Sequence, residues 1–376
     1  MNIADKYAIR EMNEKLVLKT IIDKESVSRA DIARLLNLNK TSVSSIVADL
    51  LSRDLIIEVG VAESNGGRKP TMLTFNKKAG FSLSFDVGPS YITSVLTYLN
   101  GDFVTDNYLS INDFSAENVL NTLKNDIEIY LSKLRISTYG IVGICIGIHG
   151  IVNENQVIFS PFYSFDQLDL KSELEAIFKI PVLLENEANL AALGEQKHTT
   201  SASNLVSLSV KHGVGAGIIS NGTLYTGADG HSGEIGHLIT VIDGLQCPCG
   251  NQGCLELYAS EYHILQGYKA SLHLESISFT KFKKDYLADH LEAKRMMDQF
   301  VQYMTIAVNN LITTFNPEVI IINSRFTNQI DGIIEQIEDR LLYKGKGKTI
   351  IRASTLDREA TLLGGAHLNS VQFLGF

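Results

Sequence analysis

The chain has little of what would place it in a membrane or outside a cell. In its 376 residues no run of about 18 apolar residues occurs, so no transmembrane helix is predicted. The first residues lack the basic, apolar and small-residue order of a secretion signal. With four cysteines and 45% apolar residues, the sequence predicts a folded protein of two or three globular units in the reducing cytoplasm.

The chain also lacks a net positive charge. Its 33 Lys/Arg against 42 Asp/Glu give a net charge of −9, which argues against a protein that coats nucleic acid over its whole surface. The charge is unevenly spread, because residues 1–79 carry 13 basic against 10 acidic side chains, a net +3 that leaves −12 for the rest. The amino-terminal segment is therefore the predicted electrostatic footprint for DNA.

Three of the four cysteines nevertheless fall within eight residues, as Cys247-Pro-Cys249-Gly-Asn-Gln-Gly-Cys254, and His237 lies ten residues upstream. Thiolates and a neutral imidazole at this spacing suit a tetrahedral Zn²⁺, so a structural zinc site is predicted. The alternatives are a loop of reduced thiols, or one disulfide with a spare cysteine. The short spacing of Cys247 and Cys249 disfavours a disulfide between them. Cys145, inside an apolar run, is predicted to be a core residue.

Two carboxylates flank this zinc pattern. Glu234 lies three residues before His237, and Glu256 lies two residues after Cys254. A zinc held by one ring nitrogen leaves the other nitrogen and both carboxylates free to line a pocket. Because each hydroxyl both donates and accepts, this set suits a sugar or another polyol. The alternative is a pair of surface carboxylates beside the metal loop.

The amino-terminal segment has the pattern of a helix-turn-helix. Apolar residues between Asn13 and Ile22 predict a first helix, and Ser28-Arg-Ala-Asp31 predicts a capping box that opens a second. After the turn Asn37-Leu-Asn39, apolar residues at helical spacing predict a third helix whose opposite face is polar. Such a helix enters the major groove by its first turns.

Two short predicted strands follow, Leu55–Val59 and Thr71–Phe75, joined by Gly66-Gly-Arg-Lys-Pro70. This pattern is typical of a basic wing, whose arginine suits a minor groove. The alternative is a three-helix protein-interaction module, but the charge, the polar face and the wing favour DNA. The predicted DNA-binding residues are Arg29, Lys40, Thr41, Ser42, Ser44, Ser45, Arg68 and Lys69.

The remaining chain alternates strand and helix patterns, which predicts an α/β architecture with ligands at strand ends. The predicted strands are Phe81–Gly88, Tyr91–Tyr98, Gly140–Ile148, one that ends near Glu187, Leu205–Val210 and Gly213–Ile219, with a helix over Ala188–Gln196. Lys211-His-Gly-Val-Gly-Ala-Gly217 is a Gly-rich loop, which by itself is weak evidence for a phosphate site.

Three motifs resemble the ROK family of repressors and sugar kinases: Gly233-Glu-Ile-Gly-His237, the cysteine run ending at Glu256, and Glu185-Asn-Glu-Ala-Asn189. The resemblance implies a winged helix-turn-helix over residues 1–76, followed over residues 77–376 by two actin-like (ribonuclease H-like) lobes with a cleft near residues 185–256. Within the family, Asn39–Ser45, Gly66–Pro70 and Glu261 look like the xylose repressors of Gram-positive bacteria.

Carried over by position, the resemblance implies sugar contacts from five residues, Asn186, Glu187, Glu234, His237 and Glu256. It also implies zinc ligands at His237, Cys247, Cys249 and Cys254. The implied function is a homodimeric repressor that binds operator DNA and is released by a monosaccharide, D-xylose.

Departures from the pattern bear on catalysis. The catalytic base of the family kinases is an Asp, whereas this chain has Glu187 at that position. Their first phosphate loop contains Gly-Gly-Thr, whereas this chain has Gly88-Pro-Ser90. Where they have a Gly-Gly pair that admits adenosine, this chain has Asn323-Ser324. The sequence therefore predicts no kinase activity, with an ATP-dependent sugar kinase as the rival reading. His149 and Phe162 replace a Pro and an Asn that border the sugar in the family, which leaves a different sugar, a sugar phosphate or a protein partner open.

Overall fold

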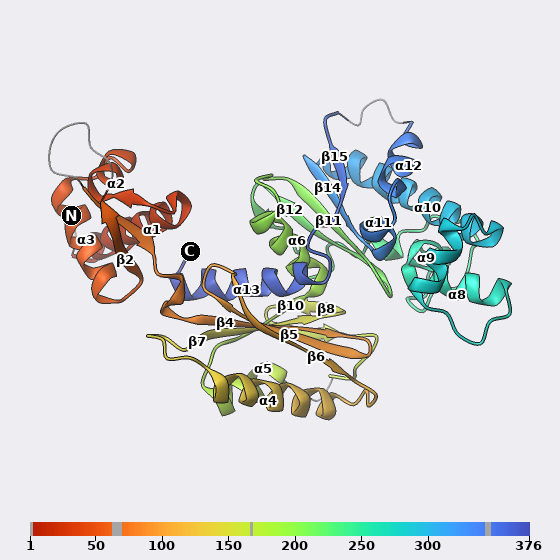
Figure 1. The fold of residues 1–376 in the computed structure, drawn as a ribbon, viewed down its shortest axis with the longest axis horizontal. Coiled ribbons are helices and arrows are strands. Elements are labelled where there is room, and N and C mark those ends of the chain that lie inside the picture. Colours follow the sequence, from red (N-terminus) through yellow and green to blue (C-terminus); the bar gives the residue numbers. More distant parts are fainter. Residues whose placement is uncertain (1–2, 62–69, 166–167, 343–346) are drawn as a thin grey trace.

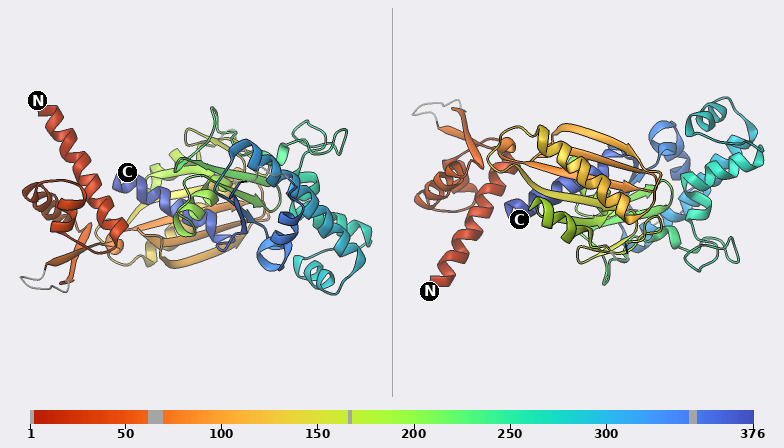
Figure 2. Two further views of the ribbon diagram at one scale, coloured as in Figure 1. Left: turned by 90° about the horizontal axis from the view of Figure 1, so that it is seen from above. Right: turned by 90° about the horizontal axis from the view of Figure 1, so that it is seen from below.

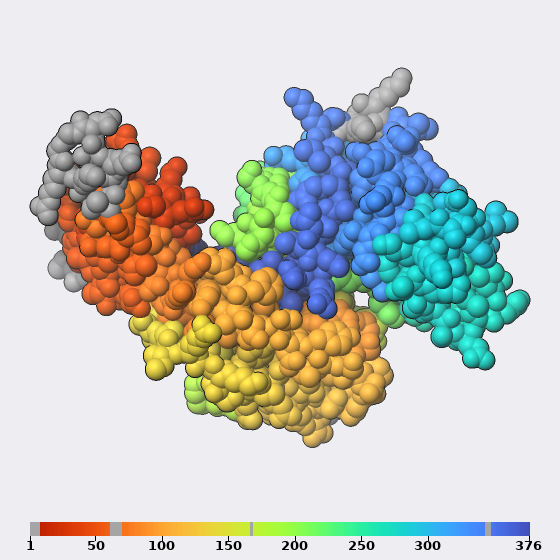
Figure 3. Space-filling model, viewed as in Figure 1, coloured from red at the N-terminus to blue at the C-terminus, as the bar shows by residue number. Residues whose placement is uncertain are grey.

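The computed structural model describes residues 3–61, 70–165, 168–342 and 347–376. An amino-terminal module and two lobes, each built on a five-stranded sheet, follow one another along the molecule (Figure 1). The two views in Figure 2 show helix α1 (Ile3–Lys24) running outward from the edge of the first lobe, with its amino-terminal end away from the rest of the molecule. A hollow separates the amino-terminal module from the second lobe (Figure 3). Over the described ranges, no helix has the length and apolar character needed to cross a membrane.

The amino-terminal module is a winged helix. Its elements after α1 are β1 (Val27–Ser28), α2 (Arg29–Leu35), α3 (Lys40–Ser52), β2 (Ile56–Val61) and β3 (Thr71–Phe75). Buried apolar side chains from all three helices and the strands form one core. The predicted helix-turn-helix and hairpin are confirmed, whereas β1, which adds a third strand to the sheet beside β3, was not predicted.

Side-chain caps fix where the second and third helices begin. Ser28 Oγ accepts from the backbone N–H of Asp31 at 3.2 Å, and the Asp31 carboxylate accepts in turn from the backbone N–H of Ser28, as a capping box requires. Oγ of Ser28 also donates to Asp31 Oδ2 at 2.7 Å. Asn39 Oδ1 accepts from the N–H of Ser42 at 2.7 Å, so α3 begins at Lys40. The predicted wing residues Arg68 and Lys69 lie outside the described residues.

The first lobe has the strand order β10-β7-β4-β5-β6, in which β4, β7 and β10 run parallel. Its elements are η1 (Lys77–Ala79), β4 (Phe81–Gly88), β5 (Tyr91–Tyr98), β6 (Phe103–Ser110), α4 (Ala116–Lys133), β7 (Ile141–Ile148), β8 (Ile151–Asn153), β9 (Gln156–Phe159), α5 (Leu170–Phe178) and β10 (Val182–Asn186). Helices α4 and α5 cover one face of the sheet (Figure 1). The predicted α/β architecture is confirmed.

The second lobe has the strand order β13-β12-β11-β14-β15, with β11, β14 and β15 parallel. Its elements are β11 (Leu205–Val210), β12 (Val214–Ser220), β13 (Thr223–Leu224), η2 (Ile235–His237), α7 (Glu256–Ala259), α8 (Glu261–Ser271), α9 (Phe279–Leu287), α10 (Leu291–Phe315), β14 (Val319–Asn323), α11 (Arg325–Gln329), α12 (Ile333–Asp339) and β15 (Ile350–Ala353). Its largest core joins the sheet to helices α8 to α12.

Two helices, α6 (Glu187–His198) and α13 (Glu359–Leu374), fill the space between the two sheets. They cross closely because glycines face backbone: a Cβ on Gly194 would lie 2.1 Å from the carbonyl oxygen of Ala360, and one on Gly364 would lie 1.8 Å from that of Leu190. The other end of α13 reaches the amino-terminal module, where Phe373 packs against its core. Helix α13 therefore connects the middle of the body to the winged helix.

Candidate functional site

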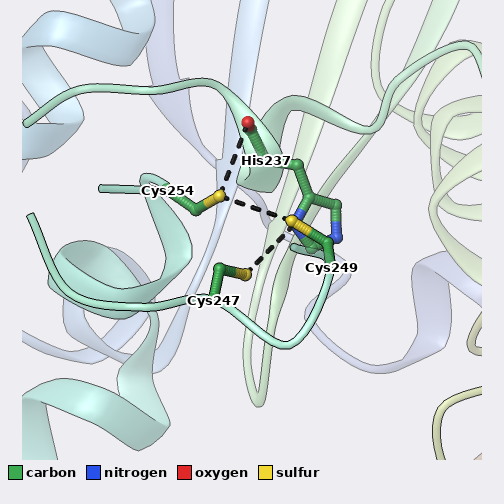
Figure 4. Close-up of side chains that lie close together, drawn as sticks. All are labelled: His237, Cys247, Cys249 and Cys254. Atoms are coloured by element: carbon green, nitrogen blue, oxygen red, sulfur yellow. Dashed lines mark hydrogen bonds between the residues drawn. The ribbon is translucent and has the colours of Figure 1, made fainter. Parts of the chain in front are cut away.

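The predicted metal ligands come together in the structure. The ligand atoms of His237, Cys247, Cys249 and Cys254 all lie within 4.8 Å of one another (Figure 4). The Sγ atoms of Cys249 and Cys254 are 3.6 Å apart, and Cys247 Sγ is 3.6 Å from Nδ1 of His237. A tetrahedron with Zn–S bonds of about 2.3 Å has edges of about 3.8 Å, so these residues fit a tetrahedral metal ion. All four cysteines are free thiols, so the disulfide alternative is not adopted.

Glycine shapes the loop that carries the cysteines. Gly253 has φ +80°, and a Cβ there would lie 1.7 Å from the carbonyl oxygen of Val241. The N–H of Cys247 donates to the carbonyl of Asn251 at 2.8 Å, and the N–H of Gly250 donates back to that of Cys247 at 3.0 Å. This tight turn brings the first two cysteines to the third, as the sequence spacing predicts.

The imidazole of His237 has one nitrogen for the metal and one for its surroundings. Nδ1 faces Cys247, whereas Nε2 lies 3.7 Å from Oε2 of Glu234. Glu256 Oε1 lies 3.8 Å from Nδ1 and 3.6 Å from Cys247 Sγ. Burial raises the pKa of Glu234, and the charges of Glu187 and Glu256 raise it further against the opposing effect of His237. The predicted carboxylate pair therefore flanks the metal ligands in one electrostatically coupled group.

The first lobe supplies Asn186 and Glu187 where β10 ends and α6 begins. Oδ1 of Asn186 accepts from the N–H groups of Ala188 and Asn189 at 2.8 and 3.1 Å, and Nδ2 donates to the carbonyl of Gly150 at 2.7 Å. Asn186 is thus the cap of α6, with one amide hydrogen left to offer. Glu187 is 9% exposed and stands at the start of the helix, where the helix dipole favours a carboxylate.

A histidine joins two strand ends of the first lobe. Nε2 of His149, which follows β7, lies 2.9 Å from Oδ1 of Asp86 on β4, and Nδ1 lies 3.8 Å from Oε1 of Glu187. The hydroxyl of Tyr91 donates to the other oxygen of Asp86 at 3.1 Å. The coulombic effect of His149 lowers the pKa of Asp86 even though burial opposes this.

A cavity of about 340 Å³ opens beside His149, between the two lobes. Pro89 and Tyr91 line it from the first lobe, and Lys211, His212 and Arg325 from the second. The lining groups gather there because carboxyl ends of parallel strands meet at one edge of each sheet. Phe162 lies close by, with its ring 5.2 Å from that of His212.

The residues that replace the kinase glycine pair are buried and fully engaged. Asn323 and Ser324 are each 1% exposed. Nδ2 of Asn323 donates to the carbonyl of Asp357 at 2.7 Å, and Oγ of Ser324 donates to Oε1 of Glu261 at 3.0 Å. Glu261 also accepts from the N–H of Arg325 at 2.6 Å. The resemblance to the family kinases implies that adenosine would enter at this position, and here the network occupies it.

The predicted DNA-contacting side chains of α3 lie along its amino-terminal turns. Lys40, Thr41, Ser44 and Ser45 are exposed, whereas Ser42 is half-buried. Arg29 differs, because its guanidinium pairs with Glu58 of β2 at 2.8 Å and ties α2 to the wing sheet.

Sequence reasoning missed the partners of His149. Asp86, Tyr91 and Lys211 were not proposed as site residues, although each lies at or next to the end of a predicted strand. Such positions at one sheet edge were the signal that could have identified them.

Comparisons with known proteins agree with this geometry. A family model described as the ROK family matches residues 82–371. The xylose repressor of Bacillus spizizenii is 34% identical over 389 residues, covering 100% of this chain and 99% of that protein. A solved ROK family transcriptional regulator, a homologue of the Escherichia coli MLC protein, superimposes with a TM-score of 0.84 at 29% identity, covering 98% of this chain and 97% of that one. A ROK family glucokinase from Streptomyces griseus, solved with glucose and AMPPNP, shares the fold, with a TM-score of 0.69 at 22% identity over 77% of this chain and 99% of that one.

Proposed function

The chain belongs to the ROK family, and from this premise we propose that it is a sugar-responsive transcriptional repressor that binds operator DNA and releases it when a monosaccharide enters the cleft. The observation that carries the proposal is α13. At one end, Thr361 Oγ1 donates to the carbonyl oxygen of Glu187 at 3.3 Å, and at the other end Phe373 packs on the winged helix. A candidate ligand site and a candidate DNA reader thus contact the same helix.

The proposed sugar site consists of Asn186, Glu187, Glu234, His237 and Glu256. Carboxylates accept from hydroxyl groups, and the N–H groups of Asn186 and His237 donate to them. D-xylose is the proposed inducer, because the relative from Bacillus spizizenii is named a xylose repressor. The clustered carboxylates Glu187, Glu234 and Glu256 would repel a phosphate, which favours a free sugar over a sugar phosphate.

The proposed metal is Zn²⁺, held by His237, Cys247, Cys249 and Cys254. Soft thiolates with one imidazole select zinc over magnesium or calcium. A closed shell of four protein ligands would make the ion structural, orienting His237 toward the sugar.

The proposed DNA reader is the winged helix of residues 1–76, and residues 77–376 form the sensor. Lys40, Arg68 and Lys69 would contact phosphates, and Thr41, Ser42, Ser44 and Ser45 would face bases. Arg29 would support the wing through Glu58 while remaining near the phosphates. We propose a homodimer, because two readers on a palindromic operator bind half-sites about one helical turn apart.

The proposed function includes no catalysis. His149 and Tyr91 engage both oxygens of Asp86, Pro89 stiffens the first phosphate loop, and Asn323 and Ser324 are buried. A coupled assay with ATP, Mg²⁺ and a sugar panel is expected to give no turnover. Turnover on the order of 1 to 100 per second would identify a kinase instead.

The decisive test combines two titrations of the metal-loaded protein. D-xylose, D-glucose and their phosphates are titrated by calorimetry, and binding of a duplex selected from a random DNA pool is followed with and without each sugar. Saturable binding of a free sugar that weakens DNA binding is the expected result, since only a ligand that prefers one state shifts the equilibrium. DNA binding that no sugar changes would contradict the proposal.

A further inference from the structure

The imidazole of His149 is held between two carboxylates in a fixed orientation. Its side chain is 11% exposed, with Asp86 Oδ1 at 2.9 Å from Nε2 and Glu187 Oε1 at 3.8 Å from Nδ1. The rings of Tyr91 and Phe162 meet it edge-on, with centroids at 6.3 and 6.4 Å. The ring plane is therefore set by packing from β5 and from the segment after β9, as well as by its polar contacts.

The two distances leave the ring nitrogens in different situations. At 2.9 Å, Nε2–H donates a charge-assisted hydrogen bond to Asp86. At 3.8 Å, Nδ1 and Glu187 attract each other without a direct hydrogen bond. A hydroxyl group placed beside this pair would meet a donor on one side and an acceptor on the other, which are the two partners that one hydroxyl needs.

We propose that His149 is a specificity-determining residue of the sugar site. With Nε2 held by Asp86, its Nδ1–H donates a hydrogen bond to a sugar hydroxyl, and the same hydroxyl donates a hydrogen bond to the carboxylate of Glu187. This inference rests on the proposed function, because it names a further contact of the same sugar. It selects a sugar that has a hydroxyl at that position.

Sugar binding by His149 and Glu187 should depend on pH, because it requires a proton on each nitrogen of the imidazole. An imidazolium has two N–H donors, one for Asp86 and one for the hydroxyl. When it loses a proton, the remaining one stays on Nε2, so Nδ1 and Glu187 become two acceptors facing a hydroxyl with one proton. Affinity for the sugar must then fall.

The groups around His149 determine the pH range in which it loses its proton. The groups facing His149 are Asp86 on β4, Tyr91 on β5, Glu187 on α6, and Lys211 and His212 after β11. Burial works against the imidazolium, but Glu187 and Asp86 outweigh it and raise the pKa of His149, while Lys211 opposes them. The donor is therefore present below this raised pKa and is lost as the pH increases through it.

The test is a calorimetric titration of D-xylose, or of whichever monosaccharide binds, into the full-length metal-loaded protein between about pH 5.5 and 9. The variants are His149→Gln, His212→Gln and His273→Asn, the last an exposed control that does not line the cavity. In the wild type, affinity should fall on the high-pH side by up to about tenfold per unit, because one proton is linked to binding. This fall should disappear in His149→Gln, which is neutral throughout, and persist in both other variants.

Monodeoxy analogues of the same sugar give a readout that a structural role would not change. The wild type should bind one analogue more weakly than the parent sugar. His149→Gln should bind that analogue and the parent sugar with similar affinity, because the variant lacks the imidazolium donor that the missing hydroxyl would meet. A high-pH fall that survives in His149→Gln, or that His212→Gln abolishes, would overturn the inference while leaving the repressor intact. If no sugar binds the wild type at any pH, the proposed function itself fails, and the inference with it.

Discussion

At the scale of single residues, the candidate site is built from carboxylates placed beside one histidine each. Glu234 stands 3.7 Å from His237, and Glu187 stands 3.8 Å from His149. Each pair offers a donor and an acceptor without a direct hydrogen bond between them. Hydroxyl groups satisfy such pairs, so this group of acidic side chains suits an uncharged polyol.

Substitution of Glu234 by alanine should abolish the response to sugar while the protein remains folded. The Glu234 side chain is only partly buried, so its removal leaves no buried group unpaired. Sugar affinity should fall on the order of ten- to a hundredfold, measured by calorimetry. Glu335→Ala, at an exposed position of α12, is the matched control. Unchanged sugar affinity in Glu234→Ala would remove this residue from the site.

At this scale the sequence predicted some contacts and missed others for a clear reason. The zinc ligands are close in the chain, so their spacing alone indicated the cluster. Asp86, His149 and Glu187 are 63 and 38 positions apart, and only the parallel pairing of β4, β7 and β10 brings them to one edge. No local pattern carries that information.

At the scale of elements, the local stability of the cysteine loop should depend on the metal ion that its thiols hold. Cys249 is exposed, whereas Cys247 and Cys254 are buried, so Cys249 closes the cluster from outside. Cys249→Ser should lose the metal, and the amides of residues 245–254 should exchange hydrogen faster, because binding energy contributes to local folding. Metal content and hydrogen exchange measure both effects. Cys145→Ala, in the core between the lobes, is the control and should keep its metal. A metal content in Cys249→Ser equal to that of the wild type would refute the ligand assignment.

Helix α3 begins in a way that suits an anionic partner. Its first residue is Lys40 and its first turn has no acidic side chain, although the helix dipole disfavours a cation there. Lys40→Ala should therefore leave thermal stability equal or slightly higher, while it weakens DNA binding and lowers the salt dependence by about one counterion. Lys284→Ala on α9 is the control. Unchanged salt dependence would mean that Lys40 does not contact a phosphate.

Elements with local signals were predicted well, and those held by distant contacts were not. The capping box at Ser28 predicted the start of α2, and the turn Asn37-Leu-Asn39 predicted that the third helix begins after it, although Asn39 itself was not predicted as its cap. The strand β1 has two residues, too few to show a pattern, and exists because it pairs with β3. Helix α13 was missed as a structural link because buried residues occur on all its sides, which leaves no amphipathic pattern to read.

At the scale of the whole molecule, α13 ties together regions far apart in the chain. Nδ2 of Asn369 donates to Oγ of Ser82 at 2.8 Å, and the ring of Phe373 meets that of Tyr139 at 4.9 Å. The hydroxyl of Tyr139 in turn donates to the carbonyl of Arg53 at 2.7 Å, at the end of α3. A shift of α6 on sugar binding would therefore reach the DNA reader through packed side chains and backbone.

Phe373→Ala should uncouple the two ends of this path. The substitution lies far from the cleft, so sugar affinity should stay within about twofold of the wild type. The ratio of DNA affinities without and with sugar, typically 5- to 150-fold in allosteric proteins, should fall towards one. Both affinities are measured on one preparation, with Gln372→Ala, exposed on the same helix, as the control. An unchanged ratio would show that the signal takes another route.

The position of α13 also has a consequence for synthesis on the ribosome. The inner face of the first sheet, made early, is covered by a helix that is made some 200 residues later than β7. Until then, the small side chains of that face, among them Ser82, Ser84 and Cys145, stay open to solvent, and the amino-terminal module lacks its contact with Phe373. A chain that ends before α13 would therefore contain the amino-terminal module and the first sheet but not the helix that links them.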